Sequence, residues 1–138
     1  ISWANATLNE FINCKYNLAF NRQTRLLSNA NYDCVNKTGE EMLEEAKRNL
    51  ESFAFFGLTE YNGLSQKLFL KTFGNSFLFL KELKQKKISV ADSYLNNLSD
   101  ENANVLLKKI KELNALDIQL YEYAKELFKK RLRLYNIY

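Results

Sequence analysis

The stretch SFAFFGLTEYNGLSQKLFLKTF, residues 52–73, passes directly from an apolar run into a helical pattern. Residues 53–58 are apolar at both alternating positions, which is typical of a strand in a parallel sheet that helices cover on both faces. Thr59 is a good N-cap for the helix that follows and would run to Gly74, so the predicted order is strand, cap, helix. A buried helical turn is the alternative interpretation, because short apolar runs do not distinguish helix from strand.

The predicted strand at 53–58 needs partners, because a lone strand leaves its backbone donors and acceptors unpaired. Residues 77–83, FLFLKEL, are the other candidate, and they fit a helix equally well. We therefore expect most of the sheet to lie upstream of Ile1. In an α/β fold, a helix beginning at Thr59 would start at the carboxyl edge of the sheet, where such proteins bind ligands.

Two further helix starts have the sequence of a capping box. Thr7 is followed three residues later by Glu10, and Thr38 by Glu41, so each pair can satisfy backbone groups at a helix N-terminus. The helix after Thr38 has an apolar stripe at helical spacing, which predicts a buried face. The stripe consists of Leu43, Ala46 and Leu50.

A long helix is expected from about 103 to 133, with its start marked by Ser99. Its apolar stripe alternates steps of three and four residues and is interrupted at Asp117. We interpret Asp117 either as a functional carboxylate or as the buried partner of a basic residue outside this chain. Residues 84–98 are polar and irregular, which predicts a surface connection. The stripe consists of Leu106, Ile110, Leu113, Leu120, Ala124 and Leu127.

Length and composition restrict the class of protein. The 138 residues suffice for one domain, and the net charge of +4 permits a polyanionic partner without requiring one. The absence of histidine removes the commonest general base and metal ligand. No apolar run reaches the roughly eighteen residues of a membrane helix, and the start does not resemble a signal peptide. Because the chain opens at Ile1 rather than Met, we expect it to be a piece of a longer protein.

Four blocks of the sequence resemble the C-terminal portion of the heparan sulfate 6-O-sulfotransferases in order and approximate spacing, over roughly residues 7–133. The blocks are CKYNLAFNRQTRLLS, AKRNLESFAFFGLTEY, FLKTF and LNALDIQLYEYAKELFKKR. Members of this family move a sulfuryl group from 3'-phosphoadenylyl sulfate (PAPS) to the 6-hydroxyl of glucosamine units. The resemblance implies an α/β fold like that of P-loop kinases, a parallel sheet flanked by helices. It makes residues 1–138 the C-terminal part of a single sulfotransferase domain, mostly helical with one strand near 53–58.

Parts of the family pattern have no counterpart here. The Gly-rich loop that would hold the phosphosulfate is missing, and so is the catalytic histidine. The resemblance places both in an N-terminal part that is absent from this chain. We therefore expect no catalytic residue, no metal site and no activity from this chain by itself.

The resemblance implies that the turn around residues 72–75 wraps the nucleotide. A phenyl ring there could stack on adenine, and Thr72 or Asn75 could hydrogen-bond the edge of the base. The alternative is structural: the phenylalanines belong to the core, and Gly74 caps a helix. The candidates for PAPS binding are Thr59, Thr72, Phe73, Gly74, Asn75 and Phe79.

The segment NRQTRLL opens an otherwise apolar helix with polar side chains that suit sulfates or carboxylates of an acceptor glycan. Alternatively, Asn21 caps the helix and the arginines are solvated or pair with Glu10 or Asp33. The basic run at 129–133 could attract the glycan by its field, or be a solvated helix end. The candidates for acceptor binding are Arg22, Gln23 and Arg25.

Cys14 and Cys34 can be interpreted as buried thiols or as one disulfide bridge. The Golgi setting that the resemblance implies favours the bridge. Glycosylation sequons occur at Asn36, which is best placed, and at Asn5 and Asn97. The resemblance further implies a location in the Golgi lumen, with the parent a single-pass type II membrane protein anchored by an absent segment. It implies a heparan sulfate chain as partner and no nucleic acid.

Two other functions remain open at this stage. One is a noncatalytic helical interaction module that docks a partner through its apolar stripes. The other is a sulfotransferase for a different glycan, such as a 2-O-specific or chondroitin enzyme. Sequence upstream of Ile1 would distinguish them, because a phosphosulfate loop and a histidine would indicate an enzyme.

Overall fold

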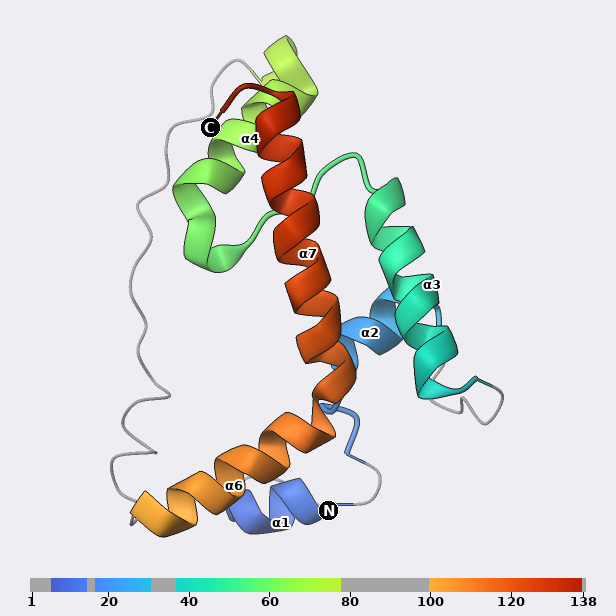
Figure 1. Cartoon of the computed structure of the whole chain (residues 1–138), viewed down its shortest axis with the longest axis vertical. Helices are drawn as coiled ribbons and strands as arrows, with labels where there is room; N and C mark the ends of the chain where they lie inside the picture. Colours follow the sequence, from blue (N-terminus) through green and yellow to red (C-terminus); the bar gives the residue numbers. More distant parts are fainter. Residues whose placement is uncertain (1–5, 15–16, 31–36, 78–99, 138) are drawn as a thin grey trace.

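The computed structural model describes residues 6–14, 17–30, 37–77 and 100–137, and this part is helical without a strand. The last helix, α7, forms the spine of the molecule, with α3 along one side and α4 packed near its C-terminal end (Figure 1). The short α2 lies between α3 and α7, and α6 crosses the lower end, where Lys109 donates to the Asn13 side chain of α1. The α-helices are α1 (Leu8–Asn13), α2 (Arg22–Leu27), α3 (Gly39–Ser52), α4 (Asn62–Phe73), α6 (Asp100–Leu113) and α7 (Ala115–Leu134), with 3-10 turns η2 (Thr59–Tyr61) and η3 (Gly74–Phe77).

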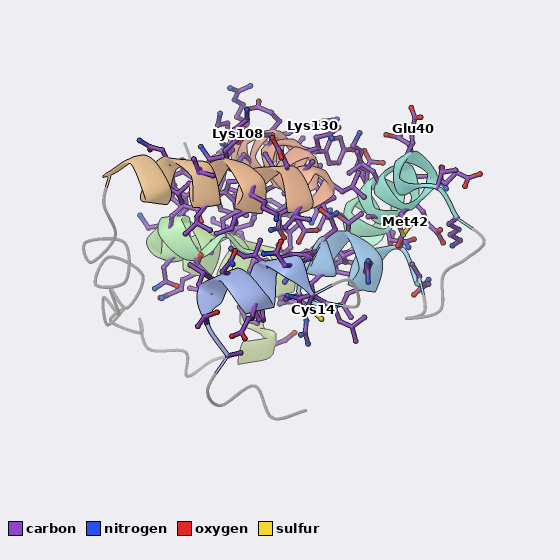
Figure 2. All side chains as sticks on the ribbon, turned by 90° about the horizontal axis from the view of Figure 1, so that it is seen from below. Cys14, Glu40, Met42, Lys108 and Lys130 are labelled. Carbon is purple, nitrogen blue, oxygen red and sulfur yellow. The ribbon has the colours of Figure 1, made fainter. Side chains whose placement is uncertain are left out.

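Both predicted capping boxes are confirmed. At α1 the Glu10 amide donates to the Thr7 hydroxyl over 3.2 Å, and the Thr7 amide donates to the Glu10 carboxylate over 2.8 Å. At α3 the Glu41 amide donates to Thr38 over 3.2 Å, and the Thr38 amide donates to Glu41 over 2.7 Å. Figure 2 shows Glu40 at the outer tip of α3, in the first turn where a negative charge opposes the helix dipole.

Two hydrophobic clusters lie along α7. The first joins α3 to the N-terminal half of α7, and it confirms the buried stripe predicted for α3. The second joins α4 to the C-terminal half of α7, where Phe128 is only 1% exposed. The first cluster consists of Leu43, Ala46, Leu50, Leu120 and Ala124, and the second of Leu68, Phe128 and Leu132.

Residues 53–58 run between these clusters without forming the predicted strand. The backbone is extended at Phe53 (φ −66°, ψ 131°) and at Leu58 (φ −110°, ψ 132°). Phe56 and Leu58 pack against both clusters, and Phe55 meets Phe69 edge-on with ring centroids 5.1 Å apart. No described segment lies alongside residues 53–58 as a partner strand, and their pairing with strands outside this chain stays a prediction. The backbone groups of residues 54–57 form no hydrogen bond within the described part.

The helix predicted to begin at Thr59 begins three residues later. Thr59 opens the turn η2 and caps no helix, and α4 starts at Asn62. The buried Ser65 holds this junction instead, since its hydroxyl accepts from the Leu58 amide over 3.0 Å and donates to the Leu58 carbonyl over 3.1 Å. A side chain at Gly57 would place its Cβ 2.9 Å from the Cβ of Ser65, so this close approach requires glycine.

The single helix predicted for 103–133 is two helices, α6 and α7. The break falls at Asn114, whose backbone (φ −111°, ψ 25°) is not helical. Its side-chain amide donates to the Ile110 carbonyl over 2.8 Å and so covers the end of α6. The predicted cap Ser99, the connection at 84–98 and most of 77–83 lie outside the described residues, although α6 does begin at Asp100.

The capping box of α3 makes stability depend on pH. Hydrogen bonds from the Thr38 amide hold the pKa of Glu41 below its ordinary value of 4.5. A carboxyl whose pKa is lowered by folding stabilises the protein above the unfolded pKa, and this contribution is lost as the pH falls through the folded pKa. Glu41→Gln keeps a side-chain acceptor but does not titrate, so we expect a shallower loss of unfolding free energy between neutral pH and pH about 3.

Urea unfolding at a series of pH values measures this effect. Glu40→Gln is the matched control, because Glu40 lies in the same turn outside the capping box. An equally steep acid limb in Glu41→Gln and the unmodified protein would contradict the prediction.

Candidate functional site

The N-termini of α2 and α7 cap each other. The Asp117 carboxylate accepts from the Thr24 amide and the Thr24 hydroxyl, each over 2.7 Å, and from the Gln23 amide over 3.1 Å. In return the Asn21 side-chain oxygen accepts from the Leu116 amide over 3.0 Å and from the Asp117 amide over 3.2 Å. Each helix thus supplies the acceptor that the first turn of the other helix lacks.

Asn21 and Asp117 are therefore helix caps in this structure. Asn21 occupies the N-cap position of α2, as predicted, but its side chain caps α7 rather than its own helix. It adopts a left-handed backbone (φ 48°), and its amide donates to the Asn114 side chain over 3.2 Å. Within the described part Asp117 caps α2, and its predicted roles as a functional carboxylate or as the partner of a basic residue outside this chain stay predictions. The interrupted stripe was the only signal of the capping role in the sequence.

The three candidates for acceptor binding all lie on α2, the helix that Asp117 caps. Arg22 and Gln23 are exposed and Arg25 is half-buried. Neither arginine forms an ion pair with another described residue, so the predicted alternative of pairing with Glu10 does not occur, and Asp33 lies outside the described residues. The structure therefore brings these three polar side chains together on one capped turn.

The nucleotide candidates divide between the two ends of α4. Gly74 ends the helix with φ 55° and ψ −136°, which confirms its predicted role as a C-cap. Phe73 is half-buried, with its ring 4.8 Å from Phe69 and 6.3 Å from Phe55, and the Thr72 hydroxyl donates to the Leu68 carbonyl over 2.8 Å.

Thr59 lies at the other end of α4, which has 12 residues and is therefore about 18 Å long. The structure thus groups Thr72, Phe73 and Gly74 and keeps Thr59 apart from them. The side chain of Asn75 and the whole of Phe79 lie outside the described residues.

Arg131 is a residue whose role the sequence did not predict. Its guanidinium lies 4.9 Å above the Phe56 ring, and Nη2 donates to the Glu51 carbonyl over 2.9 Å. Nη1 is buried and has no hydrogen-bond partner within the described part. The rest of the basic run is exposed as expected: Lys129 pairs with Glu126 over 2.8 Å, and Figure 2 shows Lys130 at the surface. A signal was available, because Arg131 follows the buried Phe128 by one helical turn.

The seam between α3 and α7 contains a tyrosine with a perturbed pKa. The Tyr123 hydroxyl donates to the Glu51 carboxylate, which raises the pKa of Tyr123 to about 12, with partial burial as a smaller cause. The phenol therefore stays protonated at neutral pH. This pair is a hydrogen bond between two helices rather than an acid-base group.

The covalent and membrane predictions are mostly untested. Cys14 is half-buried and follows α1 (Figure 2), but Cys34 lies outside the described residues, so the bridge stays a prediction. The sequons at Asn5, Asn36 and Asn97 also lie outside them. In the described ranges no cluster of three or more acidic or cysteine side chains could hold a metal ion, and no helix is long and apolar enough to cross a membrane.

Comparison with curated proteins finds relatives that are sulfotransferases. The chain is 41% identical to heparan-sulfate 6-O-sulfotransferase 1 of Homo sapiens over 137 residues, 94% of this chain and 31% of the relative. It is 41% identical to heparan-sulfate 6-O-sulfotransferase 3 of Homo sapiens, over 94% of this chain and 27% of the relative. It is 39% identical to heparan-sulfate 6-O-sulfotransferase 2 of Danio rerio, over 95% of this chain and 28% of the relative.

The resemblance to the heparan-sulfate 6-O-sulfotransferase family is thereby confirmed. The chain spans less than a third of the length of these three relatives. No family model matches it, and no solved structure does.

The turn that ends α4 depends on its glycine. The backbone of Gly74 lies in a region that side chains rarely adopt, so Gly74→Ala should lower the unfolding free energy by about 1–3 kcal/mol. No atom lies within 4 Å of an added Cβ at Gly74, so this cost comes from the backbone alone. Gly63→Ala is the matched control, since Gly63 is helical with equal space, and alanine there should stabilise by up to about 1 kcal/mol. Chemical denaturation measures both, and effects of the same sign would contradict the analysis.

Proposed function

We propose that this chain is the C-terminal part of a PAPS-dependent enzyme that sulfates the 6-hydroxyl of glucosamine units in heparan sulfate. The observation that carries the proposal is the extent of the similarity: about 40% identity over 94% of the chain, to relatives that bear this activity in their names. The relatives are more than three times as long as the matched part. The activity therefore belongs to a longer protein, to which this chain contributes one portion.

The proposed fold of that longer protein is α/β, with a parallel sheet flanked by helices. In this proposal residues 53–58 pair with strands from the rest of the protein. Three features support it: the backbone is extended at Phe53 and Leu58, residues 54–57 have unpaired backbone groups, and Arg131 Nη1 is a buried donor without an acceptor. An unpaired buried donor such as Arg131 Nη1 is costly, so a neighbouring segment that accepts its hydrogen bond would stabilise this region.

Sulfuryl transfer resembles phosphoryl transfer, so its catalysis rests on positioning and on stabilising developing charge. This chain has no histidine and no phosphate-binding glycine loop, so we assign the base and the phosphosulfate site to the rest of the protein. The turn after α4 fits the nucleotide end of PAPS. Phe73 offers a half-buried ring, and the open space around Gly74 lets a ligand approach the backbone. Thr72 and Asn75 would hydrogen-bond the base, while Thr59 and Phe79 remain proposed contacts.

The acceptor glycan is proposed to meet Arg22, Gln23 and Arg25, whose side chains suit sulfates and carboxylates. We also propose the Golgi lumen as the location and a membrane anchor outside this chain. A bridge between Cys14 and Cys34 would belong to that setting.

Enzymatic assay tests the main proposal. The full-length protein should transfer sulfate from PAPS to 6-O-desulfated heparin, with the product at the glucosamine 6-hydroxyl, whereas residues 1–138 alone should show no turnover. Sulfation at a different position would assign the chain to another glycan sulfotransferase. A full-length protein that binds glycan without turnover would support the noncatalytic interaction module instead.

The turn at 72–75 has its own test in the full-length protein. Loss of a ring that stacks on adenine should weaken PAPS binding about tenfold in Phe73→Ala, because stacking on a base contributes about 1–3 kcal/mol. Asn75→Ala should act in the same direction, and heparan sulfate binding should not change in either variant. Phe69→Ala removes a neighbouring ring of the same cluster and serves as the control for stability. Weaker glycan binding with unchanged PAPS binding would move the turn to the acceptor site.

A further inference from the structure

Helix α2 depends on contacts outside itself. It has six residues and no side-chain cap of its own, and an isolated helix of this length is not stable in water. Its first turn is held by Asp117, which accepts from the Gln23 and Thr24 amides. Thr24 is 0% exposed and donates its hydroxyl to the same carboxylate, so the contact is shielded from water.

The same turn carries polar side chains that the described part leaves without partners. Arg22 and Gln23 are the two residues before the buried Thr24, and both are exposed. Arg25 is half-buried on the next position of the helix. A fixed backbone that presents free donors lowers the cost of ordering them when a ligand binds, which is how preorganised sites gain affinity.

We propose that Asp117 is a positioning residue for acceptor binding. By fixing the first turn of α2, it holds the side chains of Arg22, Gln23 and Arg25 where they can meet the sulfates and carboxylates of a glycan chain. The inference rests on the proposed function, because it takes the ligand of α2 to be that acceptor. Asp117 itself does not touch the glycan.

Asp117 lies far along α7 from the proposed nucleotide site. The turn at Gly74 belongs to α4, which packs against Phe128 and Leu132. Asp117 precedes Phe128 by 11 residues of the same helix, which corresponds to about 16 Å. A change at Asp117 should therefore alter the affinity for the glycan while that for PAPS stays the same.

The test uses the full-length protein and steady-state kinetics with each substrate varied in turn. Asp117→Asn keeps the shape of the side chain but removes its charge and places an amide donor where acceptors are needed. Asn21→Gly keeps the left-handed backbone accessible and removes the acceptor that caps α7. We expect both variants to raise KM for heparan sulfate about tenfold, with kcat and KM for PAPS nearly unchanged. Asp117→Asn weakens hydrogen bonds to a charged group, and Asn21→Gly removes two neutral ones, and either loss is worth roughly that factor.

Two controls separate positioning from simple loss of stability. Glu126→Gln removes an exposed carboxylate of α7 that pairs with Lys129 and does not contact α2. Leu120→Val removes a methyl group from the core one turn after Asp117, where the side chain is 3% exposed. Neither control should change KM for heparan sulfate, although Leu120→Val should lower the melting temperature.

Several outcomes would overturn the proposal. One is a lower melting temperature in Asp117→Asn with an unchanged KM for heparan sulfate. Another is a rise in both KM values together with a fall in kcat, which would indicate general damage. A third is an unchanged glycan KM in Arg22→Ala, Gln23→Ala and Arg25→Ala, since there would then be nothing to position. If Asp117→Asn does not fold, the KM of Asn21→Gly for heparan sulfate becomes the test of the proposal.

Direct binding keeps this inference distinct from the proposed function. If the unmodified full-length protein transfers no sulfate, the proposed function fails, and affinity for immobilised heparan sulfate becomes the measurement. Weaker binding by Asp117→Asn than by Glu126→Gln would then still support positioning. Equal binding by the two variants would overturn it.

Discussion

The exchange of caps between Asn21 and Asp117 is the constraint on which the rest of the arrangement depends. A helix N-terminus leaves amides without partners, and here two such ends meet and satisfy each other across more than ninety residues of sequence. The exchange fixes α2 against α7, and α3 then packs on both. It also explains why the C-terminal helical stretch breaks at Asn114: a continuous helix would have no free amides at Leu116 and Asp117 to receive the Asn21 oxygen.

Sequence predicted the features that are local and missed those made between distant segments. The capping boxes at Thr7 and Thr38 need only residues three apart, so their spacing was sufficient. The break at Asn114 has no local signal, because no proline or glycine marks it. Thr59 was a reasonable cap by residue type, but Ser65 took over that junction by bonding both backbone groups of Leu58. The stretch 53–58 looked like a strand because both its faces are apolar, and here Phe55, Phe56 and Leu58 pack against the clusters that α7 forms with α3 and α4.

In the candidate sites, too, the sequence predicted local features and missed contacts between distant segments. Residue type alone was enough to single out Arg22, Gln23 and Arg25 as candidate binding residues. The structure adds that the Asp117 carboxylate accepts hydrogen bonds from the first turn of α2, which carries these side chains. Gly74 was foreseen as a helix end, and its backbone angles agree. Arg131 was grouped with solvated lysines because sequence shows a run of charge but not which members face inward. The two proposed sites then fall at opposite ends of α7, with acceptor contacts near its start and nucleotide contacts near its finish.

The unpaired backbone of residues 54–57 also bears on how the chain behaves in solution. The segment FAFFGL has no charge and no proline and consists largely of aromatic and aliphatic residues, which is the composition of segments that stack into intermolecular sheets. Phe56 and Leu58 are partly protected by α7, but Phe53 is 44% exposed and Ala54 is exposed as well. Free amides and carbonyls at such an edge are a template for pairing with another molecule. Where this segment is left uncovered, it offers backbone donors and acceptors to another molecule, although the chain carries a net charge of +4.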